Sequence, residues 1–426
     1  MLERWRGGRE AGALALHGPP GVGLRTVTVA KALRKKLSIV GLGLLAGRFP
    51  ERSSRSLQAE AARLAIEDAG LTVDLVDGGI DLRLAPGSGD LPSSSDAFPR
   101  ILGMPCRTFF QISRGGSAGI VGIVAASKFL ELGMANYFVL AMSAKDFSAT
   151  RAGKLEGYSG WKTIEKTGLW GRPFGDVAAV SHHSFFASRH MHEYGTTSEH
   201  FGRIAVGVRA WASLNPLAQF YGRPMSLDEY FASPFVVEPY RLLDMCVLTD
   251  GAVAFVLTTA ERAADLRRPP VYVLGAGVGE AMEHLWWEKA NYTRLAVDTA
   301  KAAAFREADI AIGDVDFAGL YDCFTGELLF QLEDYGWCAK GEAGPFLEQN
   351  DIGPGGSIPI NTSGGLLSAY HLGEMTHISE AIMQLRGEAG ARQVPDARIG
   401  LVSGHGGEIL APGMCSTHGS LVLGRD

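Results

Sequence analysis

The chain has 426 residues, of which 46% are hydrophobic and 20% charged, a balance typical of a compact enzyme and not of a disordered or fibrous chain. At roughly 150 residues per domain, this length suggests about two or three structural units. The formal net charge of -6 indicates no basic face and argues against a nucleic-acid partner. The five cysteines include no CxxC pair, so they predict neither a disulfide framework nor a zinc site and favour the reducing cytoplasm.

The N-terminal segment, residues 1–35, contains Arg-rich and Gly/Pro-rich pieces but no apolar core long enough for a signal peptide. We expect it to be an extension outside the fold. Its run Gly18–Thr26 resembles a phosphate-binding loop, but Leu24 and Arg25 stand where Lys and then Ser or Thr are needed. The most apolar stretch, Gly115–Met142, is interrupted by charged residues and predicts a buried helix and strand, not a membrane span.

An internal repeat is the most informative feature of the sequence. The apolar run Leu37–Gly43 reappears as Val271–Gly277, and both are short β-rich segments that end in glycine. An Ala-rich amphipathic segment follows each run, Glu60–Leu71 in the first half and Thr299–Ile310 in the second, with an offset of 239 residues between them. Strands that alternate with helices of this length predict an α/β fold, with sheets covered by helices on both faces.

The repeat divides the chain into two similar α/β halves, residues 36–262 and 268–426. Glycine-rich turns continue the match, since Gly115–Gly119 opens a predicted helix in the first half and Thr362–Gly365 opens one in the second. The first half also carries an insertion at about residues 144–240, rich in Gly, Phe, His and Tyr. A long insertion in a compact domain is usually functional.

Three glycine-rich junctions are candidate sites for negative charge. They are Gly115–Gly119, Asn361–Gly365 and Ser403–Gly407. The first two lie at predicted helix N-termini, where backbone N–H groups and the positive end of the helix dipole gather. Any one alone is most often an ordinary turn, but two at matching positions of a repeat, with a third nearby, favour a site for a developing oxyanion.

Candidate catalytic side chains stand in the second half. Tyr321 and Asp322 directly follow a predicted strand, where α/β sheets place their chemistry, although a half-buried tyrosine with a satisfied hydroxyl is the more common case. His371 falls about one turn into the helix predicted after Asn361 and can donate a hydrogen bond or move a proton. A lone helical histidine is more often structural, and His405 has the same two interpretations.

Taken together, these segments resemble the thiolase superfamily, in the branch of the sterol-carrier-protein thiolases and the bacterial lipid-transfer thiolase-like proteins. The resemblance covers nearly the whole chain from about residue 36 and rests on Tyr321–Thr325, Asn361–Gly365, Gln384–Gly390 and Gly404–Gly407. It implies a thiolase fold, with two duplicated halves that contain mixed five-stranded sheets in a layered α-β-α-β-α arrangement. It also implies a homodimer and an acyl-CoA substrate, with coenzyme A as part of the substrate and no tightly bound cofactor.

The nucleophilic cysteine of the family is missing. In thiolases the first-half helix begins with this cysteine, and glycines at later positions of the motif match Gly119 and Gly133, so the nucleophile position falls on Gly116. Ser117 is adjacent, but this register makes it a poor substitute, and no base is evident to activate its hydroxyl. Ser403 falls near the second family cysteine. The resemblance therefore argues against acyl transfer through an acyl-cysteine.

The motif Tyr321–Phe324 begins with tyrosine, and in this it resembles the thiolase-like retro-aldolases that shorten steroid side chains. In that group this tyrosine and a second one after the Asn-Thr-Ser-Gly-Gly segment are assigned to proton transfer, which implies the same for Tyr321 and, shifted by one residue, for Tyr370. The Gly-His-Pro histidine of the family corresponds to His371, and Asp322 is a further catalytic candidate. A DUF35-type partner protein, with an OB fold and a zinc ribbon, is also implied.

The expected activity is cleavage of a 3-hydroxyacyl-CoA to a ketone or aldehyde and a short acyl-CoA. This reaction needs a base and an oxyanion hole for the enolate, but no nucleophile. The residues expected to bind substrate or to form the oxyanion hole are Gly116, Ser117, Asn361, His405 and Gly407. Two alternatives stay open: an acyl-CoA C-acyltransferase with an unconventional catalytic residue, and a non-catalytic CoA- or lipid-binding subunit of a complex.

Overall fold

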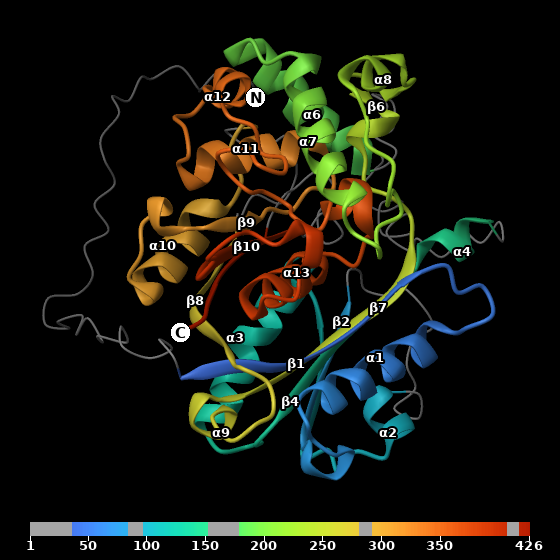
Figure 1. The fold of residues 1–426 in the computed structure, drawn as a ribbon, viewed down its shortest axis with the longest axis vertical. Helices are drawn as coiled ribbons and strands as arrows, with labels where there is room; N and C mark the ends of the chain where they lie inside the picture. The colour runs from blue at the N-terminus through green and yellow to red at the C-terminus, as the bar shows by residue number, and fades with distance from the viewer. Residues whose placement is uncertain (1–35, 84–96, 152–178, 281–291, 407–416) are drawn as a thin grey trace, which may run out of the picture.

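The computed structural model describes residues 36–83, 97–151, 179–280, 292–406 and 417–426 (Figure 1). The strands of its main sheet are β1 (Leu37–Gly47), β2 (Gly78–Arg83), β3 (Thr108–Ser113), β4 (Phe138–Lys145), β7 (Asp250–Thr259), β8 (Val271–Glu280), β9 (Phe317–Gly319), β10 (Ile399–Gly406) and β11 (Thr417–Gly424). A small separate sheet contains β5 (Phe235–Val237) and β6 (Tyr240–Arg241). The α-helices are α1 (Ser54–Asp68), α2 (Phe98–Leu102), α3 (Ala118–Glu131), α4 (Asp146–Arg151), α6 (Ala179–Tyr194), α7 (Ser198–Ser213), α8 (Leu227–Ala232), α9 (Ala260–Ala263), α10 (Val297–Ala308), α11 (Thr325–Tyr335), α12 (Ala343–Gln349) and α13 (Met375–Arg386).

The two halves of the main sheet have the same strand order. Outward from the centre, the first half runs β1-β7-β4-β2-β3 and the second runs β8-β11-β10-β9. An isolated bridge between Ala318 and Ile360 stands in the second half where the first half has its fifth strand. The halves join where Leu37–Ile39 of β1 pairs antiparallel with Val271–Val273 of β8. The predicted duplicated α/β fold is confirmed. In the second half, the bridge between Ala318 and Ile360 replaces the outermost strand.

Helices form three layers around the two halves of the sheet (Figure 1). Helices α3 and α13 contact strands of both halves and therefore lie between them. Helices α1 and α2 cover the first half, and α10 and α11 cover the second. This is the layered α-β-α-β-α arrangement that the resemblance implies.

Glycine explains how the repeat packs. A Cβ on Gly43 would lie 2.0 Å from the carbonyl oxygen of Ala61 in α1, and a Cβ on Gly277 would lie 2.1 Å from that of Ala300 in α10. Only glycine therefore lets each helix approach its strand so closely. The same backbone contact at matching positions of the two halves accounts for the glycines that end both apolar runs.

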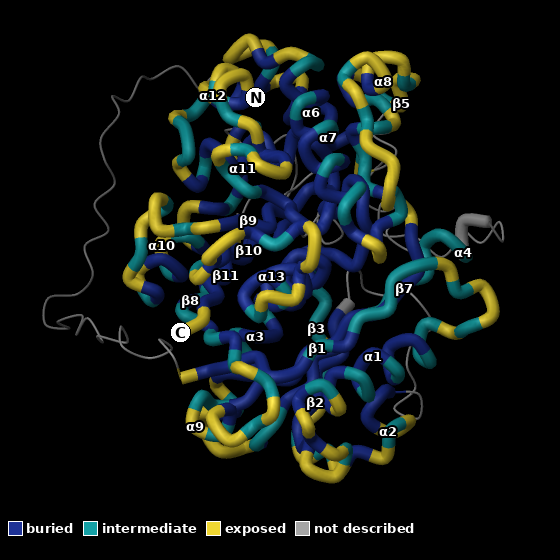
Figure 2. Tube along the Cα trace, viewed as in Figure 1, coloured by how far each residue is buried: buried dark blue, intermediate teal, exposed yellow. Residues whose placement is uncertain are grey.

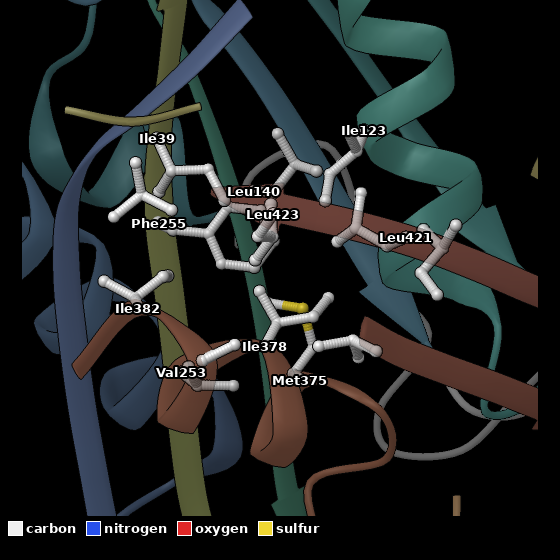
Figure 3. Packing of buried hydrophobic residues seen from close by; sticks show 14 of the residues in the cluster. Ile39, Ile123, Leu140, Val253, Phe255, Met375, Ile378, Ile382, Leu421 and Leu423 are labelled. Carbon is white, nitrogen blue, oxygen red and sulfur yellow. The ribbon is translucent and has the colours of Figure 1, made fainter. Parts of the chain in front are cut away.

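The core between the two halves is built from both of them. Ile123 of α3, Ile378 of α13, Leu140 of β4, Phe255 of β7 and Leu421 of β11 are fully buried and belong to one cluster (Figure 3). Figure 2 shows the same distribution for the whole fold, with buried residues along the strands and the central helices and exposed residues on the outer turns. The two halves thus share a hydrophobic interior.

The helix predicted after Asn361 begins later than the sequence suggests. Gly364 has a φ of 95°, Gly365–Ala369 form a single π-helical turn, and Tyr370 is extended with a φ of -156°. The α-helix starts only at Met375. Because Gly364 and Tyr370 break the helical conformation, His371 lies in the loop before α13, and our expectation that it sits inside a helix is wrong.

The described part of the insertion contains α6, α7 and α8 and packs against the second half. Phe186 of α6 and Phe201 of α7 share a buried cluster with Phe330 of α11. The predicted extension at residues 1–35, and residues 152–178 of the insertion, lie outside the described residues. None of the described helices is long and apolar enough to cross a membrane.

The shared core gives a stability prediction. Replacing Ile378 by Ala removes a fully buried side chain from the layer between the halves, so we expect the free energy of unfolding to fall by about 2–5 kcal/mol. Leu132→Ala is the control, since Leu132 is 74% exposed and its loss should change the free energy by less than about 0.5 kcal/mol. Denaturant unfolding measures both, and equal losses would contradict a core shared by the two halves.

Candidate active site

The ring of Tyr321 lies against Gly116, just before the N-terminus of α3. A Cβ added at Gly116 would lie 2.2 Å from Cε2 and 2.3 Å from Cζ of Tyr321, and 2.4 Å from the carbonyl oxygen of His405. Carbon atoms do not approach this closely, so residue 116 cannot carry a side chain while the ring is in place. The position that the sequence assigns to the missing thiol is therefore filled by Tyr321.

Hydrogen bonds fix the backbone of Tyr321 on both sides. Its N–H donates to Oγ of Ser403 at 2.9 Å, and its carbonyl accepts from Nε2 of Gln331 at 2.7 Å. Ser403 in turn donates to Oε1 of Gln331, and both side chains are fully buried. Ser403, near the second expected cysteine position, thus holds the backbone of Tyr321, and Gln331 is a site residue that sequence reasoning missed.

Asn361 holds the residue before Tyr321. Its Oδ1 accepts the N–H of Leu320 at 2.7 Å, and its Nδ2 donates to the carbonyl of Leu320 at 2.9 Å. Asn361 has a φ of 53°, a left-handed conformation that asparagine adopts more readily than most residues. Its side chain therefore shapes the chain that carries Tyr321, and the substrate contact assigned to it from the sequence stays a prediction.

Asp322 connects Tyr321 to the loop that contains His371. The carboxylate of Asp322 accepts the N–H of Leu366 at 2.8 Å and that of Leu367 at 3.4 Å. A Cβ on Gly365 would lie 2.0 Å from Oδ2, so only glycine leaves room for this contact. Asp322 thus holds the π-helical turn in place and fixes the loop relative to Tyr321.

His371 is a buried neutral imidazole. Its backbone N–H donates to Oγ1 of Thr249 at 2.9 Å, and its Nδ1 lies 4.0 Å from Oδ2 of Asp146. Burial lowers the pKa of His371 to about 4, against the opposing effect of the Asp322 charge. Burial, together with the charge of Asp250, raises the pKa of Asp146 to about 6. At pH 7 the imidazole can therefore donate one hydrogen bond without carrying a charge.

The start of α3 offers fewer free N–H groups than the sequence suggests. The N–H of Ala118 donates to the carbonyl of Gly115 at 3.3 Å, and the N–H of Gly119 donates to the carboxylate of Glu374. Glu374 is fully buried, and this burial raises its pKa to about 7. The N–H groups of Ala118 and Gly119 therefore already have partners within the protein.

Glu327 and His183 are two buried residues that sequence reasoning missed, and they contact His405, which the sequence predicted. The ring centroid of His405 lies 6.1 Å from that of Tyr321, and its Nε2 lies 3.3 Å from Oε2 of Glu327. The other oxygen of Glu327 lies 2.5 Å from Nδ1 of His183. A glutamate within the apolar helix sequence was the available signal for Glu327, but His183 stands in the insertion and no local pattern marks it.

Not every predicted residue joins this group. The hydroxyl of Tyr370 lies 3.3 Å from Oγ of Ser379 in the central core, and burial raises the pKa of Tyr370 to about 12. The hydroxyl of Ser117 donates to the carbonyl of Thr417 at 3.5 Å. Both hydroxyls are thus directed to other partners, and Gly407 lies outside the described residues.

Comparison with known proteins identifies relatives along most of the chain. The family described as Thiolase C-terminal domain-like matches residues 279–425. The chain is 35% identical over 368 residues to the 17-hydroxy-3-oxo-4-pregnene-20-carboxyl-CoA lyase of Mycobacterium tuberculosis, covering 83% of this chain and 92% of the relative. It is also 35% identical over 362 residues to the steroid side-chain-cleaving aldolase of Thermomonospora curvata, covering 82% and 90% of the two chains.

Solved structures agree with these relatives. The Ltp2-ChsH2(DUF35) aldolase matches with a TM-score of 0.81 and 31% identity, covering 93% of this chain and 99% of that chain. The acetyl-CoA acetyltransferase from Syntrophomonas wolfei matches with a TM-score of 0.66 and 16% identity, covering 92% and 100%. The second match supports the fold alone.

The contact between Gly116 and Tyr321 predicts coupled stability effects. Gly116→Ala should lower the free energy of unfolding by about 1–3 kcal/mol, because the new methyl group overlaps the ring of Tyr321. In a Tyr321→Ala background part of this cost should disappear, with an interaction energy of about 0.5–3 kcal/mol. Denaturant unfolding of the two single variants and the double variant measures it.

Gly119→Ala is the matched control for this cycle. Its Cβ would meet Sδ of Met375 at 2.7 Å and Oε1 of Glu374 at 2.9 Å, and no atom of Tyr321 is among its nearest neighbours. We expect its effect to be the same with and without the Tyr321 ring. Purely additive effects for Gly116→Ala would show that the ring does not occupy this space.

Proposed function

This chain belongs to the thiolase superfamily, in the branch of the steroid side-chain-cleaving aldolases, and we propose on that basis that it breaks a 3-hydroxyacyl-CoA into a ketone or aldehyde and a short acyl-CoA. The observation that carries the proposal is the ring of Tyr321 in the space beside Gly116. It excludes an acyl-cysteine at this position, and retro-aldol cleavage does not need one. The enzyme is a carbon–carbon lyase that acts on a CoA thioester.

Tyr321 is the proposed group for proton transfer. In its phenoxide form it takes the proton of the C3 hydroxyl, the C2–C3 bond breaks, and its electron pair passes into the thioester carbonyl as an enolate. The proton can then return to C2, so the reaction needs no net proton source. A positioned acid or base of this kind contributes about 10²–10⁴ in rate. The two backbone hydrogen bonds of Tyr321 support the role, because they fix the main chain that carries the ring.

His371 is the proposed partner of the enolate oxygen. Because its pKa is lowered to about 4, the imidazole is neutral at pH 7 and stabilises the developing charge with one N–H. The backbone around Gly116 and Gly407 is proposed to supply further donors, and Asp322 holds the His371 loop at the right place. Tyr370 remains a weaker candidate, because its hydroxyl lies near Ser379 and its pKa is raised to about 12.

The proposed substrate is a steroid whose side chain ends in a CoA thioester. The relative from Mycobacterium tuberculosis is named for a 17-hydroxy steroid with a 20-carboxyl-CoA group. Such a compound is a 3-hydroxyacyl-CoA, since the hydroxyl carbon is β to the thioester carbonyl. Cleavage of the bond between the hydroxyl carbon and the carbon α to the thioester yields a steroid ketone and a short acyl-CoA, which are the products proposed above.

Two partners are proposed for the assembly. A DUF35-type protein is supported by the solved Ltp2-ChsH2(DUF35) aldolase, to which this chain is 31% identical. A homodimer is supported by β3, which lies at the edge of the sheet and carries Phe109 with 38% of its surface exposed. An exposed edge strand has unpaired N–H and C=O groups that a second chain can use.

Tyr321→Phe tests the proton-transfer role. Loss of the hydroxyl should lower kcat by about 10²–10⁴, with little change in KM, because the ring still fills the space beside Gly116. Release of ketone and acyl-CoA from a steroid 3-hydroxyacyl-CoA, followed by mass spectrometry, measures it. Tyr272→Phe, which removes a surface hydroxyl bonded to Asp426, is the control. Unchanged turnover in Tyr321→Phe contradicts the role.

His371→Gln tests the enolate partner. The variant should lose about 10²–10³ in kcat, as expected for the removal of one oxyanion donor. Because the pKa of His371 is about 4, the imidazole stays neutral through the working range, so the same fold loss is expected at about pH 6 and about pH 8. A loss that is present at about pH 6 and vanishes at about pH 8 would point to a charged form of His371 as the active one.

A further inference from the structure

Two buried His–Glu pairs join α6 to α11. Nδ1 of His183 lies 2.5 Å from Glu327, and Nε2 of His190 lies 3.0 Å from Glu333. All four side chains are at most 1% exposed. The histidines stand seven residues apart on α6 and the glutamates six apart on α11, so the pairs are successive contacts between the same two helices.

The two pairs differ in what else they touch. Glu333 lies 3.0 Å from Nζ of Lys340, and His190 lies 2.7 Å from Oγ1 of Thr196. None of these printed partners belongs to the group around Tyr321. Glu327 instead reaches Nε2 of His405 at 3.3 Å, and His405 adjoins Tyr321.

The charge of Glu327 must be balanced inside the protein. A buried carboxylate without a positive partner costs several kcal/mol, on the order of the stability of a domain. Lys340 supplies a positive charge to Glu333. For Glu327, both partners among the described ion pairs are histidines, His183 and His405. Within the described residues, a proton on either of these two imidazoles is what balances the charge of an ionised Glu327.

We propose that Glu327 is a positioning residue for the retro-aldol cleavage: it holds His183 and His405 in a buried triad that carries one extra proton and fixes the His405 imidazole beside Tyr321. This inference rests on the proposed function. The backbone N–H of His405 also donates to the carbonyl of Gly116 at 2.9 Å, so the main chain of His405 is held beside Gly116.

The triad acts on Tyr321 in two ways. The ring of Tyr321 is confined between Gly116 and His405, and displacement of a catalytic group by about 1 Å costs on the order of 10² in rate. A positive charge shared by the two imidazoles also favours the phenoxide form that accepts the substrate proton. Glu327 exerts both effects through His405 and does not touch the substrate itself.

Glu327→Gln tests the proposal, because it keeps the size of the side chain and removes its charge. We expect kcat on a steroid 3-hydroxyacyl-CoA to fall by about 10- to 100-fold with KM nearly unchanged. Glu333→Gln is the matched control, since it alters the other buried pair of the same two helices and should leave kcat near the wild-type value. An unchanged kcat in Glu327→Gln, or equal losses in the two variants, overturns the proposal.

A second measurement does not depend on turnover. The signals of His183 and His405 can be assigned in ¹⁵N-histidine-labelled protein by comparison with His183→Gln and His405→Gln. In the wild type, we expect one of these two residues to give an imidazolium signal. It should disappear in Glu327→Gln and persist in Glu333→Gln. Two neutral imidazoles in the wild type would overturn the triad. If the wild type cleaves no substrate, the proposed function fails, and these spectra still decide whether the triad exists.

A folding failure of Glu327→Gln would not end the test. His183→Gln leaves Glu327 and His405 in place and removes only the partner on α6. We expect a smaller fall in kcat and a changed His405 signal in this variant. Wild-type values for both would contradict the proposal.

Discussion

The space beside the Cα of Gly116 holds the ring of Tyr321 and leaves no room for a second side chain. This steric constraint connects the two departures from the thiolase pattern. The thiol is missing at residue 116, and the ring of Tyr321 occupies the space in which its side chain would lie. A cysteine at residue 116 would have to displace the ring. Carbon–carbon cleavage is compatible with this arrangement, since it needs a proton-transfer group and an oxyanion site but no nucleophile.

The rest of the site serves to hold that ring. Ser403 and Gln331 fix the backbone of Tyr321, and Asn361 fixes the residue before it. Asp322 then ties the loop of His371 to the same chain. These hydrogen bonds all come from the second half, while Gly116, just before α3, brings the first half against the ring of Tyr321. The duplicated fold, with its two halves joined through one core, therefore assembles the site.

Much of this could be predicted from the sequence, because repeats and glycine patterns are local signals. The two apolar runs that end in glycine indicated the duplication. The motif Tyr321–Phe324 indicated a tyrosine that could act without the missing thiol. Two kinds of information were absent. Successive side chains of an extended segment point to opposite sides, so Tyr370 enters the core while its neighbour His371 faces Asp146. The contact of Glu327 with His183 spans 144 residues, and no periodicity encodes a contact at that separation.

The central claim is that the chain cleaves a carbon–carbon bond without an acyl-enzyme. The most direct measurement is cleavage of a steroid 3-hydroxyacyl-CoA in D₂O without added free CoA, alone and with a DUF35-type protein, followed by mass spectrometry of products and intact enzyme. The account predicts one acyl-CoA for each ketone, one solvent-derived deuterium bound at C2 of the acyl group, and no mass added to the protein. Cleavage that requires free CoA, with an acyl group bound to the protein, would contradict it.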